Sequence, residues 1–122
     1  MRKFALVIFL LLSFASSNAL AGRIVVANDE WTLSNSGFFN PNDPAQFAQN
    51  VGAWFGGGNF LVFSSNFGLT ESSLAAAMTG AGYGWTVSTN VSELANLSTY
   101  SGIFLAGTAI DNTLLIDYVN AG

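Results

Sequence analysis

The sequence contains no cysteine and no histidine among its 122 residues. The first absence excludes disulfide bonds, thiol nucleophiles and thiolate metal sites. The second removes the commonest general base and the commonest zinc ligand. Chemistry by this chain alone would therefore rest on carboxylates, hydroxyl groups and backbone amides. We expect no cofactor and no metal site.

Basic residues are also scarce. Arg2 and Lys3 stand at the N-terminus, and beyond residue 21 only Arg23 opposes seven acidic residues, a net charge of −6. Nucleic acids and anionic lipids bind proteins through Lys and Arg, which replace their counterions. We therefore predict no nucleic-acid partner, and membrane contact only through the N-terminal leader or a C-terminal anchor beyond Gly122.

The N-terminal residues follow the three-part plan of a secretory signal peptide. Two basic residues precede an apolar run from Phe4 to Leu12, and the segment ends with Ala19-Leu20-Ala21. This A-x-A ending predicts cleavage after Ala21. An uncleaved anchor is the alternative, but the apolar run is well short of the ~20 residues that span a bilayer. We expect a signal peptide at 1–21, a secreted or cell-envelope location and, since the exported chain has no disulfides, a bacterial source.

Four short apolar runs punctuate the remaining chain. Each is rich in β-branched or aromatic residues and is too short for a helix, which predicts strands buried on both faces. The segments between them have apolar residues at helical spacing. The predicted strands are Ile24–Ala27, Phe60–Phe63, Trp85–Val87 and Ile103–Ala106.

The first predicted helix has clear boundaries. Asp43-Pro44 supplies an N-cap and a proline at the first position, and Gln46 is the expected capping-box partner. Gly56-Gly57-Gly58 should end this helix. Its apolar stripe, expected to face the core, comprises Phe47, Val51, Trp54 and Phe55.

Three further helical segments are predicted. Thr70 should cap the second helix, with Glu71 in its first turn and Leu74 and Met78 on its inner face. Gly80, Gly82 and Gly84 should end it. The other two segments are a short turn over Ser92–Leu97 and a final helix from Asp111 to Gly122.

Strands that alternate with helices predict a three-layer α/β sandwich with a mainly parallel sheet, of flavodoxin-like type. Residues 22–122 are 101 in number, a length that suits one domain. The sequence stops directly after a predicted helix, which would leave a parallel sheet with an uncovered edge. We therefore expect 22–122 to be the N-terminal part of one α/β domain in a longer protein.

Ligands of open α/β sheets bind outside the carboxyl ends of the strands. The polar residues that follow the predicted strands are therefore the candidates for a site. We expect a ligand to contact Asp29, Glu30, Trp31, Ser65, Asn66 and Thr108.

The Asp29-Glu30-Trp31 corner has two readings. Adjacent carboxylates point to opposite sides of an extended chain, so they do not form an acid and base pair. The spaced acidic ligands of a calcium loop are also absent. The favoured interpretation is a strand that ends in solvent while Trp31 packs inward over the core. In the alternative, Trp31, Phe38 and Phe39 form an exposed cluster that stacks on a sugar or a protein partner.

The glycine-rich and serine-rich stretches do not predict catalysis. Gly56-Gly57-Gly58 and Gly80–Gly84 follow helices and precede strands, whereas a phosphate loop follows a strand and opens a helix. Ser64-Ser65-Asn66-Phe67-Gly68 has the correct position for an anion or an oxyanion, but no histidine could activate its serines. We predict no catalytic residue in this chain.

The stretches NFLVFSSNFGLTESSLAAAMTGAGYGWTVST and LSTYSGIFLAGTAIDNTLLIDYVNAG, within Asn59–Gly122, resemble the class I glutamine amidotransferase-like domains. The resemblance implies that Ala106-Gly107-Thr108 lies where active members hold an oxyanion with backbone amides. The family pattern has two glycines there, and this chain has Gly107-Thr108. The family's nucleophilic cysteine would follow Gly122, with its histidine and glutamate partners later still.

The opening VVANDEWTLSNSGF, together with the leader, resembles secreted bacterial proteins with a C-terminal PEP-CTERM sorting signal. We therefore expect a non-catalytic amidotransferase-like binding or structural domain whose partner is a small molecule, a glycan or an envelope component. A hydrolase or amidotransferase whose nucleophile lies beyond residue 122 is the alternative. A surface-layer or matrix component with a convex strand-end surface and no pocket is a third.

Overall fold

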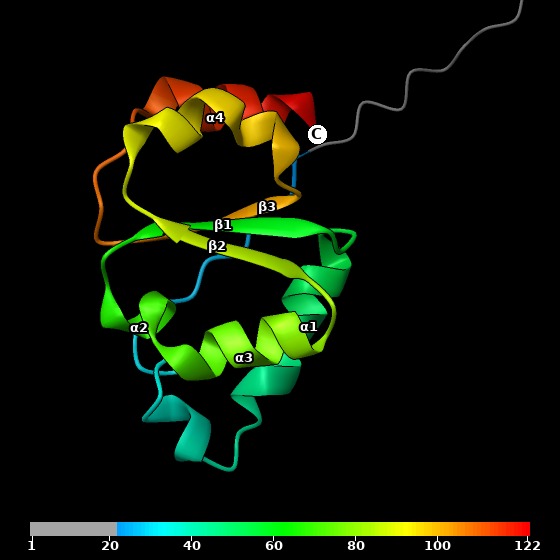
Figure 1. Cartoon of the computed structure of the whole chain (residues 1–122), viewed down its shortest axis with the longest axis vertical. Coiled ribbons are helices and arrows are strands. Elements are labelled where there is room, and N and C mark those ends of the chain that lie inside the picture. The colour runs from blue at the N-terminus through cyan, green and yellow to red at the C-terminus, as the bar shows by residue number, and fades with distance from the viewer. Residues whose placement is uncertain (1–21) are drawn as a thin grey trace, which may run out of the picture.

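The computed structural model describes residues 22–122, so the predicted signal peptide at 1–21 lies outside the described residues. Three parallel strands form one sheet in the order β2-β1-β3, with helices on both faces (Figure 1). The predicted α/β class and the parallel sheet are confirmed. Among residues 22–122, no helix has the length and apolarity needed to cross a membrane. The strands are β1 (Asn59–Ser64), β2 (Gly84–Ser88) and β3 (Gly102–Ala106).

Strand β1 forms the centre of the core. Phe60, Leu61 and Val62 are fully buried, because each backbone side of β1 is paired and each face is covered. Phe60 packs with Leu74 and Met78 on one face of the sheet, whereas Leu61 lies in a second cluster on the other face. The two flanking strands are only partly buried. The prediction of full burial is thus correct for β1 alone.

The helices form a layer on each side of the sheet (Figure 1). One layer contains η1 (Gly37–Phe39), α1 (Pro44–Trp54), α2 (Phe67–Thr70) and α3 (Ser72–Gly80). The other contains the 3-10 segment η2 (Val91–Thr99) and α4 (Asn112–Ala121), which confirms the predicted short turn and final helix.

The predicted boundaries of α1 are confirmed in most respects. Asp43 accepts a hydrogen bond from the Gln46 amide at 3.0 Å. The Gln46 side chain donates to Asn50 Oδ1 at 2.8 Å instead of returning to the Asp43 amide, so the second bond of the capping box was wrongly predicted. Gly56 and the two glycines after it have φ values of 93°, 71° and 92°. Residues with side chains rarely adopt such values, so the three glycines end α1 as expected.

The predicted start of the second helix is wrong. Thr70 ends the short helix α2, and its hydroxyl donates to the Asn66 carbonyl at 3.0 Å. Glu71 is the N-cap of α3, but its carboxylate accepts from the Asn35 amide at 2.5 Å. The cause is a contact distant in sequence, which draws the Glu71 side chain away from the helix. The final helix starts near Asp111 as predicted, and Asp111, its N-cap, accepts from the Thr113 amide at 2.8 Å.

The strand predicted at Ile24–Ala27 is also wrong. These residues belong to an irregular segment, Gly22–Trp31, which we call the strap. Ile24 and Val26 are 66% and 78% exposed, although their side chains are typical of a buried strand. In the described part of the chain, no backbone hydrogen bond joins Ile24–Ala27 to a strand. The strand was predicted from the run of apolar residues alone. The backbone hydrogen bonds to a neighbouring strand that a strand requires are absent here among residues 22–122.

The two-layer burial predicts different costs for two leucines. Leu74 is fully buried in α3, whereas Leu114 in α4 is 38% exposed. Leu74→Ala should lower the free energy of unfolding by ~2–5 kcal/mol, because it leaves a cavity in the core. Leu114→Ala should cost less than about 1 kcal/mol. Urea unfolding followed by circular dichroism measures both. Equal losses would contradict the described packing of α3.

Candidate functional site: the strap and its groove

The N-terminal end of the strap is attached to both helix layers. The Arg23 guanidinium donates to the Trp54 carbonyl at the end of α1, and its centre lies 5.6 Å from the middle of the Trp54 ring. A Cβ atom added to Gly22 would overlap the backbone of Val119 in α4. Only glycine permits this approach, so the strap begins where α1 and α4 end.

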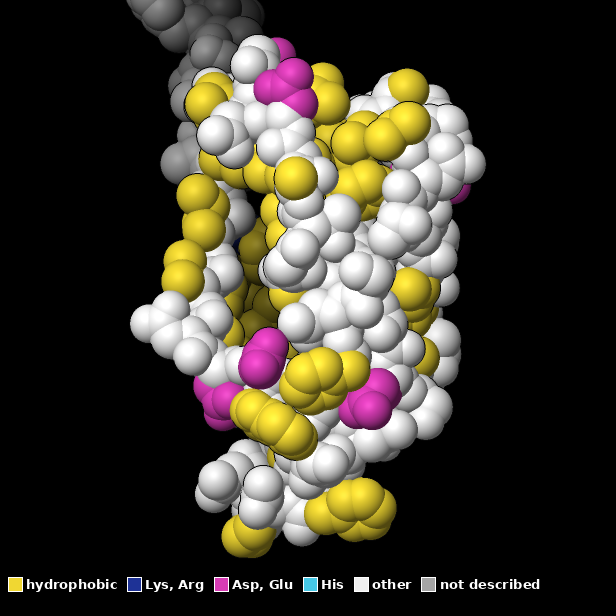
Figure 2. Space-filling model, turned by 90° about the vertical axis from the view of Figure 1, so that its left-hand side faces the viewer, with side chains coloured by type: hydrophobic (Ala, Val, Ile, Leu, Met, Phe, Trp, Pro, Cys, Tyr) yellow, Lys and Arg dark blue, Asp and Glu magenta, His cyan; other side chains and the backbone are white. Residues whose placement is uncertain are grey.

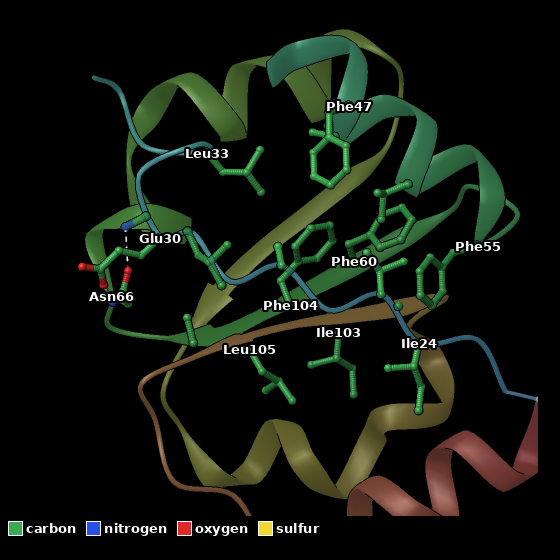
Figure 3. Close-up of a pocket in the computed structure, with 18 of the residues that line it drawn as sticks. Ile24, Glu30, Leu33, Phe47, Phe55, Phe60, Asn66, Ile103, Phe104 and Leu105 are labelled. Carbon is green, nitrogen blue, oxygen red and sulfur yellow. Dashed lines mark hydrogen bonds between the residues drawn. The ribbon is translucent and has the colours of Figure 1, made fainter. Parts of the chain in front are cut away.

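The other end of the strap is attached at the carboxyl edge of the sheet. Asn66 Nδ2 donates to Glu30 Oε2 at 3.2 Å, while Asn66 Oδ1 accepts from the Gly68 amide at 2.8 Å (Figure 3). A Cβ atom at Gly68 would overlap the Glu30 carbonyl. One asparagine thus starts α2 and binds the strap. The structure brings Glu30 and Asn66 together, as the position of both at the carboxyl edge predicts.

Asp29 closes a turn beside this attachment. Its carboxylate accepts from the Trp31 amide at 2.9 Å and from the Thr32 hydroxyl at 2.6 Å. The Thr32 hydrogen bond, followed by that from Trp31, lowers the pKa of Asp29 below its ordinary value, because both bonds favour the charged form. The carboxylate therefore stays ionised and is committed to the turn, as the favoured interpretation of a solvent-facing carboxylate expects.

The strap and β3 enclose a groove of about 770 Å³. Viewed toward the ends of the strands, it is a hollow with hydrophobic side chains inside and acidic side chains beside one end (Figure 2). The surface at the strand ends is therefore hollow and not convex. In the close-up, hydrophobic side chains line it above and below the plane of the sheet (Figure 3). They include Phe47, Phe55, Phe60 and Phe104 on the α1 side, and Ile103 and Leu105 on the side of η2 and α4.

The α1 stripe predicted to face the core partly lines the groove instead. Phe47, Val51 and Phe55 are lining residues, and Phe47 is 39% exposed. The buried positions within α1 include the small residues Ala48 and Gly52. A Cβ atom at Gly52 would lie 2.6 Å from the Tyr83 ring, so α1 packs closely through its small residues. This packing leaves the large side chains facing the groove.

Ser65 and Thr108 lie together, but outside the groove. The Ser65 amide donates to the Thr108 hydroxyl at 3.3 Å, which joins the ends of β1 and β3. The buried Ser64 hydroxyl donates to the Ala106 carbonyl at 2.5 Å. Gly107 has a φ of 66°, so the chain turns sharply at the position that the family resemblance identifies. Of the six predicted site residues, the four that line the groove are Asp29, Glu30, Trp31 and Asn66.

Trp31 does not pack inward over the core, so the favoured interpretation of the corner is wrong for this residue. It is 57% exposed and lies edge-on to Phe67, with ring centres 5.0 Å apart. Attachment of Glu30 to Asn66 positions the next side chain over α2 instead of the core. The alternative cluster is also incomplete, because Phe39 is 91% exposed whereas Phe38 packs against the core.

The groove presents apolar side chains together with the polar side chains of Arg23, Asp29, Glu30 and Asn66. Within residues 22–122, no three acidic, histidine or cysteine side chains gather to hold a metal ion. The hydroxyl of Ser64, at the end of β1, donates a hydrogen bond to the Ala106 carbonyl. Among the described hydrogen bonds, none joins this hydroxyl to a base. The sequence analysis did not predict the apolar lining of the groove. The apolar stripe from Phe47 to Phe55 was the signal that could have indicated this lining. The stripe alone does not tell whether protein or a ligand covers these side chains.

Two substitutions of Asn66 separate its roles. Asn66→Ala removes both the helix cap and the bond to Glu30, and it should cost about 1 kcal/mol of stability. Asn66→Asp keeps an oxygen for the Gly68 amide but places a carboxylate against Glu30. The strap should therefore become more mobile in both variants, and the heteronuclear 1H–15N nuclear Overhauser effect of its amides should fall.

Unfolding experiments supply the comparison for these variants. The aspartate variant should retain most of the wild-type stability, because a carboxylate caps a helix as well as asparagine does. An unchanged nuclear Overhauser effect for residues 23–31 in both proteins would show that Asn66 does not hold the strap.

No protein family, curated protein or solved structure matches this chain. The resemblance of Asn59–Gly122 to the class I glutamine amidotransferase-like domains therefore stays a prediction. Function is inferred from the geometry of the strap, the groove and the strand ends.

Proposed function

We propose that this chain is a non-catalytic, amidotransferase-like binding domain of a secreted bacterial envelope protein, and that its ligand occupies the groove between the strap and β3. The observation that carries the proposal is the groove itself, which has a volume of about 770 Å³. Clefts of this size commonly hold small-molecule ligands. The strap that borders this space is attached at both ends.

The distribution of polar groups in the groove supports binding. The lining is mostly apolar, with polar side chains of Asp29, Glu30 and Asn66 at one end. Binding sites commonly combine an apolar wall with a few polar groups that orient the ligand. Ile24 and Val25 on the strap line the groove and are exposed, and a ligand that covers such apolar surface gains free energy.

The composition and hydrogen bonds favour a non-catalytic role. The chain has no histidine or cysteine. The Ser65 amide, which lies near the turn expected to hold an oxyanion, already donates to Thr108. An oxyanion site needs donors aimed at developing charge. The Thr108 hydroxyl accepts the hydrogen bond of the Ser65 amide, so this amide is not free to bind an oxyanion.

Export is a separate part of the proposal, and it rests on the leader at 1–21. Expression with the leader in a bacterial host should yield exported protein whose N-terminal residue is Gly22. Intact-mass spectrometry of the periplasmic or culture fraction measures this. Recovery of the uncleaved chain from the membrane fraction would favour an anchor instead.

Ligand binding can be tested with two matched isoleucines. Ile24 and Ile116 are 66% and 58% exposed, but only Ile24 lines the groove. The neutral apolar dye Nile red should bind the purified protein and fluoresce. Ile24→Asp should weaken this binding at least tenfold, because it adds a charge to an apolar wall, at a cost above about 1.4 kcal/mol.

Ile116→Asp is the control for this measurement. It adds the same charge at a similarly exposed position on α4, so dye affinity should stay within about twofold of wild type. Equal loss in both variants would indicate a general effect of charge. If the folded wild-type protein shows no saturable binding of the dye, the proposed function is contradicted.

A further inference from the structure

One edge of β3 is unpaired and faces the groove. Within the described residues β3 pairs only with β1, in parallel register from Gly102 to Ala106. Alternate residues of a parallel strand direct their backbone groups to opposite sides, so about half of these groups face away from β1. The strap runs along that side but forms no ladder with it. All five residues of β3 line the groove.

We propose that the groove binds an extended, apolar polypeptide segment, which adds to the sheet as a fourth strand beside β3. The proposal rests on the proposed binding function and specifies its ligand. Main-chain hydrogen bonds to the β3 edge would supply part of the affinity, and pockets for alternate side chains would supply the specificity. The five residues of β3 correspond to a strand of about 17 Å.

The two-sided lining favours a strand over other apolar ligands. Phe104 belongs to the cluster on the α1 side, and its neighbour Ile103 to the cluster on the α4 side. The walls of the groove therefore lie on both sides of the sheet plane (Figure 3). A strand in that plane points successive side chains to opposite faces, which matches this arrangement. A lipid chain would cover the same side chains but leave the edge N–H and C=O groups without partners.

The charge of the groove restricts the segment further. Asp29 and Glu30 line the end near the carboxyl edge of the sheet, whereas Arg23 lines the groove near the end of α1. Like charges close together repel, so an acidic group is disfavoured at the end beside Asp29 and Glu30. A second copy of this chain brings the same acidic surface. The preferred ligand is an apolar strand with a basic residue at the end that meets Asp29 and Glu30.

The test uses the peptide acetyl-Lys-Val-Ile-Val-Thr-Val-Lys-amide and the purified wild-type protein. Binding is measured by isothermal titration, and amide exchange of β3 by nuclear magnetic resonance. We expect saturable binding and at least tenfold slower exchange of amides within Ile103–Ala106. The same peptide with N-methyl groups on two adjacent residues near its centre loses a donor on each edge. Its affinity should fall at least tenfold.

Two matched leucines supply variants. Leu105 of β3 is 39% exposed and lines the groove, whereas Leu114 of α4 is 38% exposed and does not. Leu105→Lys should abolish peptide binding, and Leu114→Lys should leave it within about twofold of wild type. If circular dichroism shows that the Leu105 variant does not fold, the N-methylated peptide and the exchange data on wild-type protein still test the proposed fourth strand.

The remaining outcomes separate this proposal from the general one. Nile red binding without peptide binding would overturn the fourth strand and leave the binding function standing, whereas absence of both would overturn both. Equal affinity for the N-methylated peptide, or tighter binding of laurate than of the peptide, would also overturn the strand. Protection of β3 that grows with protein concentration in the absence of peptide would identify a second copy as the occupant instead. Protection of β3 in a longer chain that continues past Gly122 would identify the following segment as the occupant and would also overturn the proposal.

Discussion

The pairing of β1 with a parallel strand on each side is the constraint on which the rest of the structure depends. A strand paired on both sides and apolar on both faces must be covered above and below. Phe60 and Leu61 point to opposite faces, and each belongs to its own apolar cluster. The two helix layers follow from this requirement. Residues of α1 and α4 also line the groove, so the layers that cover β1 provide its walls.

The strap converts an open sheet edge into a partly enclosed site. Arg23 attaches it to α1 at one end of the sheet, and Asn66 holds it through Glu30 at the other. Its middle residues make no ladder with β3 in the described structure. Unpaired edges are normally covered or blunted in soluble proteins. Here the strap lies beside the edge of β3, and the groove separates the two. This geometry is suited to a binding role.

Much of the fold could be predicted from local signals. The apolar runs of β1, β2 and β3, the cap at Asp43 and the glycine stops act over a few residues, so they can be read from neighbouring positions. The predictions that failed depended on distant contacts. Glu71 leaves its helix for Asn35, and Trp31 stacks on Phe67. The groove itself arises from segments far apart in the chain.

The candidate site divides in the same way. The sequence alone determined that no thiol or imidazole chemistry is available to this chain, and that polar residues follow the strands, because composition and local pattern do not depend on packing. Only the tertiary structure decided that Ile24–Ala27 is part of the strap and that Asn66 meets Glu30. An apolar run favours a buried strand wherever a partner strand is present. The hydrogen-bonded ladder forms only where the two backbones can lie side by side. Attachment at both ends holds the strap away from that position.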